Sequence, residues 1–139
     1  MFMTKNLKPE NDFVLLPIGV IESSIINRED APSQGNEGAP DAWIVINTNV
    51  MEGLDGIKVG QNIIILTWFH QSKRDVLKLH PRWDKNNPLT GVFATRSPDR
   101  PNPIGLHEVT VLEITGNKIK VASIEAINGT PVIDIKPII

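Results

Sequence analysis

Apolar residues along this chain come in short runs rich in isoleucine and valine, and turn-forming residues separate these runs. No stretch of eleven or more residues keeps the 3.6-residue period of an amphipathic helix. Short β-branched runs bounded by turns are typical of strands. The pattern therefore predicts about seven strands, at 14–25, 42–48, 61–70, 91–95, 106–114, 118–126 and 131–135.

The connections between these runs support a mostly β chain. Thr115-Gly116-Asn117 separates two alternating runs and predicts a hairpin, and Asn128-Gly129 suits a type I′ turn. One helical turn is expected at 52–56. Strict alternation on the last strand would place Val132 and Asp134 on one face, with Ile133 and Ile135 on the other.

The unpaired backbone groups at the edges of a sheet of short strands have to be paired or covered, which favours a closed barrel over an open sheet. We therefore expect an all-β fold with little helix: a small closed or nearly closed β-barrel with long irregular loops. At 139 residues the chain is expected to form a single domain over 1–139.

Composition narrows the function classes. The net charge is −2, so contact with nucleic acid requires a local basic patch rather than the field of the whole molecule. Cysteine is absent, which excludes disulfides and thiolate sites. The longest apolar run is far below the roughly 20 residues of a membrane span, and the first residues lack the apolar stretch of a signal peptide. A cytoplasmic protein without a membrane segment is expected.

Several common chemistries are not indicated. The sequence has no phosphate-binding loop of the Walker type and no dinucleotide-binding fingerprint. Its histidines, His70, His80 and His107, do not stand at a ligand spacing with a carboxylate, so no metal site is expected. A single histidine on a strand is more often a structural hydrogen-bonding group.

The most distinctive segment is 91–105, Gly-Val-Phe-Ala-Thr-Arg-Ser-Pro-Asp-Arg-Pro-Asn-Pro-Ile-Gly. Its three prolines each restrict φ and also restrict the preceding residue, so the loop has little conformational freedom to lose on binding. Arg96 and Arg100 offer planar sets of N–H donors, while Asn102 offers a donor and an acceptor. This combination predicts a rigid ligand-binding loop.

A second long loop, 71–90, is basic and contains a tryptophan. Its relevant residues are Lys73, Arg74, Lys78, His80, Arg82, Trp83 and Lys85. Phosphate contacts and base stacking use such residues, whereas a solvated loop with the same charge would serve only solubility. Charge alone favours the solvated loop, and the nearby rigid loop supports the RNA-binding interpretation.

Four runs carry a resemblance to a known family: PIGVIESS at 17–24, MEGLDGIKVGQNIIILTWFH at 51–70, GVFATRSPDRPNPIG at 91–105 and NGTPVIDIKP at 128–137. Together they span nearly the whole chain and resemble the TrmO family, also called TsaA-like or YaeB-like proteins. The resemblance implies a small β-barrel and an S-adenosylmethionine-dependent methyltransferase. It also implies a homodimer with the cofactor near the subunit boundary, and methylation of N6 on threonylcarbamoyl-adenosine beside the anticodon of tRNA.

The resemblance also implies a cofactor pocket drawn from several segments. Its expected residues are Gln34, Gly35, His70, Gln71, Arg96, Leu106, Ser123, Ile124 and Glu125. Glu125 stands where the family often has an aspartate. For RNA contact, the candidates are Lys73, Arg74, Arg82, Trp83 and Arg100.

Arg96, Asn102 and Arg100 are the expected catalytic residues. The Asn102 oxygen is suited to accept the adenine N6–H and direct its lone pair toward the methyl group. Arg96 or Arg100 is suited to pair with the methionyl carboxylate or a phosphate. Each has a structural alternative, an arginine capping the barrel rim or an asparagine closing a turn, and for Arg100 the two interpretations are evenly balanced.

Two departures from the family pattern affect the substrate. Asp99 replaces a residue that is often histidine or aromatic, and it is expected to lower the positive charge beside Arg100. The chain also ends at Ile139, so the C-terminal domain of longer relatives is expected to be absent. The alternatives are a non-catalytic S-adenosylmethionine- or nucleotide-binding sensor or assembly module, and methyl transfer to another small substrate.

Overall fold

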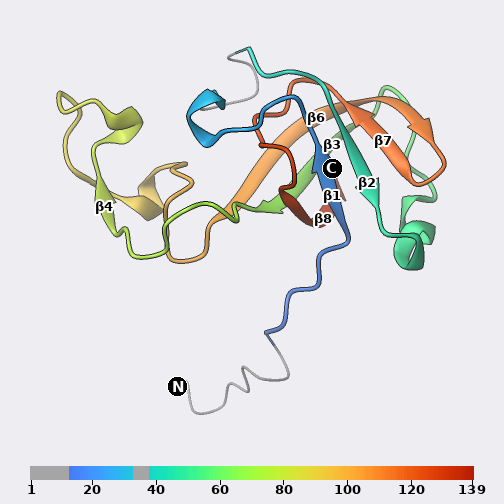
Figure 1. Ribbon diagram of the computed structural model, residues 1–139, viewed down its shortest axis with the longest axis horizontal. Coiled ribbons are helices and arrows are strands. Elements are labelled where there is room, and N and C mark those ends of the chain that lie inside the picture. The colour runs from blue at the N-terminus through green and yellow to red at the C-terminus, as the bar shows by residue number, and fades with distance from the viewer. Residues whose placement is uncertain (1–12, 33–37) are drawn as a thin grey trace.

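Six antiparallel strands form a closed barrel with the order β1-β2-β7-β6-β3-β8 (Figure 1). The structure is a computed structural model and describes residues 13–32 and 38–139. The barrel strands are β1 (Gly19–Glu22), β2 (Ala42–Ile46), β3 (Asn62–Trp68), β6 (Ile104–Thr115), β7 (Lys118–Val121) and β8 (Pro131–Pro137). Because β1 pairs with both β2 and β8, the ring has no open edge between its first and last members. The predicted all-β barrel is confirmed.

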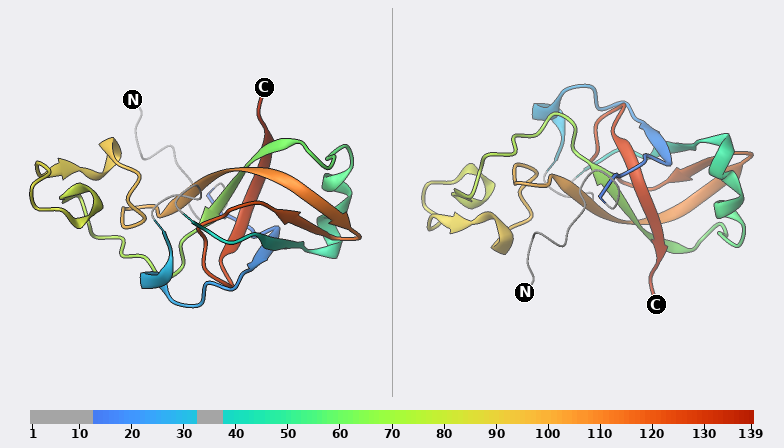
Figure 2. Two further views of the ribbon diagram at one scale, coloured as in Figure 1. Left: turned by 90° about the horizontal axis from the view of Figure 1, so that it is seen from above. Right: turned by 90° about the horizontal axis from the view of Figure 1, so that it is seen from below.

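A separate ribbon of two short strands, β4 (Lys78–Leu79) and β5 (Thr90–Gly91), lies in a lobe that projects from the barrel (Figure 1). We call residues 71–96 the lobe. The remaining elements are short 3-10 helices: η2 (Arg28–Asp30), η4 (Thr48–Leu54), η5 (Pro81–Trp83) and η6 (Val92–Ala94). Figure 2 shows the lobe on one side of the barrel, with η4 and the tip of the β6–β7 hairpin on the other.

Alternation along the strands builds the core. In β2, Ala42, Ile44 and Ile46 are buried, whereas the intervening Trp43 and Val45 are only half-buried. Each fully buried isoleucine contributes roughly 1.5–3 kcal/mol of transfer free energy. The other members of the core cluster are Ile21, Ile63, Ile65, Val109, Val111, Ile119, Val121, Ile124, Ala126 and Val132.

The turns agree with the sequence in part. Thr115 pairs with Lys118 across the predicted hairpin, and Gly116 takes φ 59° there. At Asn128-Gly129 only Gly129 has a positive φ, whereas a type I′ turn requires it at both central residues. The type I′ prediction is therefore wrong. The expected helical turn is present, although η4 begins earlier and ends at Leu54.

Two strand predictions fail for identifiable reasons. Segment 91–95 is mostly η6 rather than a strand, because the Arg100 guanidinium and the Thr95 hydroxyl both donate to the Val92 carbonyl and curl the chain. The strand expected at 118–126 ends at Val121. Ser123 then adopts φ 51°, and its N–H donates to the Asp41 carboxylate.

The first and last strands also differ from expectation. β1 covers only Gly19–Glu22, and residues 13–16 before it are exposed. In β8, Val132 pairs with Thr67 and Asp134 pairs with Leu66, which leaves Ile133 as an extra residue in a bulge. The bulge overrides strict alternation, so Val132 is buried and Ile135 also packs against the core. Among the described helices, none is both long and apolar enough to cross a membrane.

Candidate functional site

A cleft of about 1480 Å³ lies between the barrel and the lobe. It is lined by the end of β3, the start of β6, the segment after β7 and the central loop, which we define as residues 92–103. The predicted residues that line it are His70, Gln71, Arg82, Trp83, Arg96, Arg100, Asn102, Leu106, Ser123 and Glu125. The fold thus gathers residues from segments far apart in the chain.

Other predicted site residues lie elsewhere. Ile124 does not line the cleft, because it is fully buried in the barrel core. Gln34 and Gly35 fall outside the described residues. Lys73 and Arg74 are exposed beside the cleft rather than part of its lining.

Arg100 organises the central loop. Its guanidinium donates to the carbonyl oxygens of Val92 at 2.8 Å, Thr95 at 3.0 Å and Ser97 at 3.0 Å. These bonds wrap the loop around one half-buried side chain. Such a geometry suits the planar guanidinium and supports the structural interpretation of Arg100.

Asp99 ties the central loop to two other segments. Its carboxylate accepts from the Arg28 guanidinium at 2.6 Å and from the Lys73 backbone N–H at 2.8 Å. The side chain is only 1% exposed. Asp99 was expected to lower the positive charge beside Arg100, but its own charge is buried and paired with Arg28. Its observed role is therefore structural.

Arg74 holds the tip of the central loop. Its Nε donates to the Pro101 carbonyl at 2.7 Å, and its terminal nitrogen donates to Asn102 Oδ1 at 2.9 Å. The guanidinium also lies 5.1 Å from the centre of the Trp68 ring, within cation–π range. Asn102 is exposed, and its oxygen keeps one acceptor position beyond Arg74.

Arg96 is an exposed cation that lines the cleft. One of its terminal nitrogens donates to the Leu106 carbonyl at 3.2 Å, which leans the side chain over the start of β6. The guanidinium has five N–H donors, so further donors remain for a ligand carboxylate or phosphate. This arrangement agrees with the ligand-binding interpretation of Arg96.

His107 lies at the floor of the cleft between two polar partners. Its Nε2 lies 2.8 Å from Thr67 Oγ1, and its Nδ1 is hydrogen-bonded to the Glu125 carboxylate. The Phe69 and His107 rings pack in a T-shaped arrangement with ring centres 5.8 Å apart. The expectation that a strand histidine serves as a hydrogen-bonding group is confirmed here.

The residues that the sequence predicted for the site did not include His107, Thr67, Phe69 or Gly105. A Cβ at Gly105 would lie 2.4 Å from Thr67 Oγ1 and 2.5 Å from Phe69 Cζ, so only glycine leaves this space. Thr67 and His107 follow the inward alternation of β3 and β6 into the core. A polar residue at an inward strand position was the signal that could have found them.

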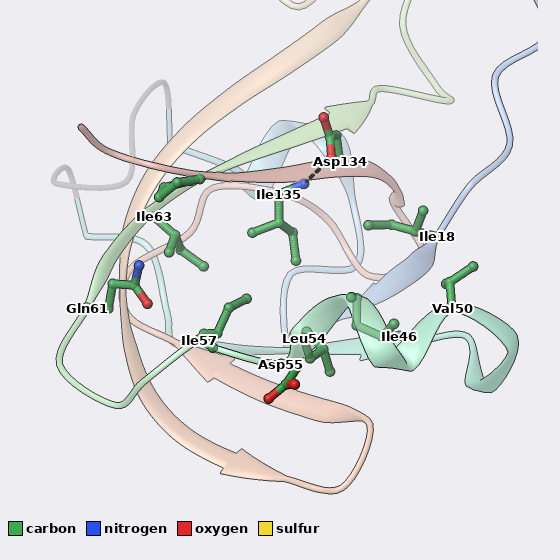
Figure 3. A pocket seen from close by; sticks show the side chains of 13 residues that line it. Ile18, Ile46, Val50, Leu54, Asp55, Ile57, Gln61, Ile63, Asp134 and Ile135 are labelled. Carbon is green, nitrogen blue, oxygen red and sulfur yellow. Dashed lines mark hydrogen bonds between the residues drawn. The ribbon is translucent and has the colours of Figure 1, made fainter.

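A second recess, of about 460 Å³, lies at the opposite end of the barrel beside η4 (Figure 3). Figure 3 shows Ile63, Leu54 and Ile135 around it, with the Asp134 oxygen accepting the Ile135 N–H. None of the predicted cofactor or catalytic residues lines it. The cleft has convergent polar groups and the recess is mainly apolar, so the cleft is the candidate site. Within the described chain, no cluster of three His, Asp or Glu side chains is arranged to hold a metal ion.

Comparisons with known proteins show the family of the chain. Residues 20–139 match the family described as the tRNA-methyltransferase O N-terminal domain. A probable S-adenosyl-L-methionine-binding protein of Methanocaldococcus jannaschii is 48% identical over 130 residues, covering 89% of this chain and 90% of the relative. An S-adenosyl-L-methionine-binding protein of Archaeoglobus fulgidus is 42% identical over 123 residues, covering 88% of this chain and 87% of the relative.

Solved structures show the same fold. A crystal structure of TrmO from Pseudomonas aeruginosa aligns with a TM-score of 0.72 at 28% identity and covers 91% of this chain. Another TrmO crystal structure aligns with a TM-score of 0.72 at 30% identity, again over 91% of this chain. The chain spans only about half the length of these structures, 55% and 57% respectively.

Proposed function

We propose, because this chain belongs to the family of the tRNA-methyltransferase O N-terminal domain, that it is an S-adenosylmethionine-dependent methyltransferase. The proposed substrate is N6 of threonylcarbamoyl-adenosine next to the anticodon of tRNA. One observation carries the proposal: a cleft collects six of the nine residues expected to hold the cofactor, namely His70, Gln71, Arg96, Leu106, Ser123 and Glu125.

The chemistry of the cleft fits S-adenosylmethionine. The cofactor has a carboxylate, an ammonium group, a ribose diol and a flat adenine ring. Exposed Arg96 suits the carboxylate, and the Glu125 carboxylate suits an ammonium or hydroxyl donor. Leu106 and Phe69 supply apolar surface for the ring. When bound, the cofactor supplies an electrophilic methyl group on a sulfonium.

The chain's own residues then have to hold the acceptor amine in line with that methyl group. The central loop is stiffened by its prolines and by Arg100, which limits its motion during binding. Arg74 fixes the Asn102 amide, and the remaining acceptor position on Asn102 Oδ1 is suited to the amine N–H. Accepting that N–H would orient the nitrogen lone pair toward the methyl group.

The lobe supports an RNA substrate. Trp83 is 72% exposed, and both Trp83 and Arg82 adopt left-handed backbone conformations that residues other than glycine rarely adopt. An exposed tryptophan that follows Arg82 in the chain, in a lobe that also carries Lys73 and Arg74, suits base stacking with phosphate contacts. A homodimer and a cytoplasmic location, where tRNA is modified, belong to the same proposal.

A second candidate is a non-catalytic sensor or assembly module that binds S-adenosylmethionine. The names of the relatives favour it, because they describe binding and no reaction. Methyl transfer to another small substrate is the third candidate, since the chain spans only about half of the TrmO structures.

Two measurements on the purified protein distinguish these candidates. Titration calorimetry measures binding of S-adenosylmethionine, and mass analysis of nucleosides from added tRNA then detects methyl transfer. Binding with a methyl-mass gain on threonylcarbamoyl-adenosine supports the proposed enzyme. Binding without transfer favours the sensor or another substrate. Absence of binding contradicts the cofactor assignment and with it all three candidates.

A further inference from the structure

Residue His107 occupies an inward position on β6, where its neighbours Val109 and Val111 are core residues. Its side chain is fully buried, and both ring nitrogens have partners. A carboxylate can only accept, so Nδ1 must carry the proton that binds Glu125. In the neutral ring Nε2 is then an acceptor, and the Thr67 hydroxyl donates to it. Thr67, His107 and Glu125 thus form a directed chain of hydrogen bonds.

Neighbouring residues confine the His107 imidazole to one position. A Cβ on Gly105 would lie 2.8 Å from His107 Nε2, and the planes of the Phe69 and His107 rings are at 87° to each other. The ring therefore has little freedom to rotate. Burying a polar group among valine and isoleucine is unfavourable unless its hydrogen bonds are complete, as they are here. Such an arrangement is suited to fixing the residue at the cleft end of these hydrogen bonds, which is Glu125.

Glu125 stands at that outer end. Its side chain is 16% exposed and lines the cleft, and one carboxylate oxygen is bound by His107. The second oxygen is the acceptor that Glu125 can offer to a ligand. A glutamate has one more rotatable bond than an aspartate, so an anchor on one oxygen restricts a side chain that would otherwise have several rotamers.

We propose that His107 is a positioning residue for the cofactor: it acts through Glu125, whose carboxylate it holds at the cleft floor to accept a hydrogen bond from a donor group of S-adenosylmethionine. This inference rests on the proposed function, because its ligand is the proposed cofactor. Both ring nitrogens of His107 are engaged by Thr67 and Glu125, so its contribution passes through the Glu125 carboxylate.

The test is a double-mutant cycle on cofactor affinity, with His107→Gln, Glu125→Gln and the double variant titrated with S-adenosylmethionine. Each single variant is expected to weaken binding by about tenfold, equivalent to about 1.4 kcal/mol. In the Glu125→Gln background, His107→Gln is expected to cause little further loss. Thermal unfolding of the ligand-free variants checks that each is folded.

A merely structural histidine would behave differently. The inference would be overturned if His107→Gln lowered cofactor affinity equally in the wild-type and Glu125→Gln proteins. Unchanged affinity in a folded His107→Gln protein would also overturn it. If His107→Gln does not fold, Thr67→Val removes the hydroxyl at the other end of the hydrogen-bond chain with a side chain of similar shape. The double-mutant cycle of Thr67→Val with Glu125→Gln is then interpreted in the same way. Failure of the wild-type protein to bind S-adenosylmethionine would instead refute the proposed function, so the two failures are distinct.

Discussion

Asp99 and Arg28 form an ion pair of 2.6 Å that joins the central loop to η2, although the residues are 71 positions apart. Asp99 also accepts the Lys73 backbone N–H at 2.8 Å, so one buried carboxylate holds three segments together. The rigid shape of the cleft rim therefore depends on a contact that is distant in sequence.

Replacing Asp99 with alanine should destabilise the fold by about 2 kcal/mol, because a charged guanidinium and a backbone N–H lose their partner. Chemical denaturation measures the change in the free energy of unfolding. The matched control is Asp75→Ala, an exposed carboxylate at the lobe, which is expected to change stability by less than about 0.5 kcal/mol. Equal effects from the two changes would contradict the structural role of Asp99.

Gly105→Ala should be strongly destabilising or prevent folding, because the new Cβ would meet Thr67, Phe69 and His107 at less than 3 Å. Overpacking of this kind typically costs about 1–3 kcal/mol. Gly53→Ala is the control, since a Cβ there meets nothing within 4 Å. Thermal unfolding compares the two proteins, and a Gly105→Ala variant as stable as the control would show that the cleft floor can rearrange.

Arg100→Lys should loosen the central loop, since an ammonium cannot reproduce the fixed geometry with which the guanidinium binds three carbonyl oxygens. Hydrogen exchange should become faster for the amides of residues 92–100. Arg96→Lys, which changes an exposed arginine of the same loop, should leave that exchange unchanged while weakening cofactor binding. Unaltered exchange in Arg100→Lys would argue against its role in loop folding.

Asn102→Ala should abolish methyl transfer while leaving S-adenosylmethionine affinity nearly unchanged, because Asn102 is proposed to orient the acceptor amine. Arg74→Ala should reduce turnover by roughly tenfold through loss of the amide's anchor, with a similarly small effect on affinity. Single-turnover kinetics together with calorimetry separates the two quantities. A parallel fall in affinity and turnover would assign Asn102 to cofactor binding instead.

Trp83→Ala should weaken tRNA binding by about 1–3 kcal/mol if the exposed ring stacks on a base. The affinity of S-adenosylmethionine should stay the same. Val59→Ala, an exposed apolar change before β3, serves as the control for general surface effects. Filter binding at several salt concentrations measures the affinity, and unchanged binding by Trp83→Ala would support the solvated-loop interpretation of the lobe.

Local pattern was enough to predict much of the barrel. The runs that became β2, β3 and β6 were visible because alternating β-branched residues match a strand with one buried face. The prolines of the central loop indicated a rigid segment, because each one fixes its own φ and restricts the residue before it. Gly116 marked the β6–β7 hairpin through a conformation that glycine adopts without strain.

Local pattern failed where distant groups decide the backbone. Alternation on β8 is broken by the bulge at Ile133, which depends on pairing with β3. The predicted strand at 91–95 is curled by Arg100, whose role becomes visible only when its three carbonyl partners are close. Arg74 was predicted to contact RNA, and its anchoring of Asn102 had no signature in the sequence.

Strand content, the proline-restricted backbone of the central loop and the residue types available for binding follow from the order of amino acids, because these features depend on neighbours along the chain. Which of those residues meet depends on the folded barrel. Its closure brings His107 of β6, Thr67 of β3 and Glu125 after β7 into one hydrogen-bonded chain. Hydrogen bonds and ion pairs act over a few ångströms, so contacts between residues tens of positions apart exist only once the sheet has closed.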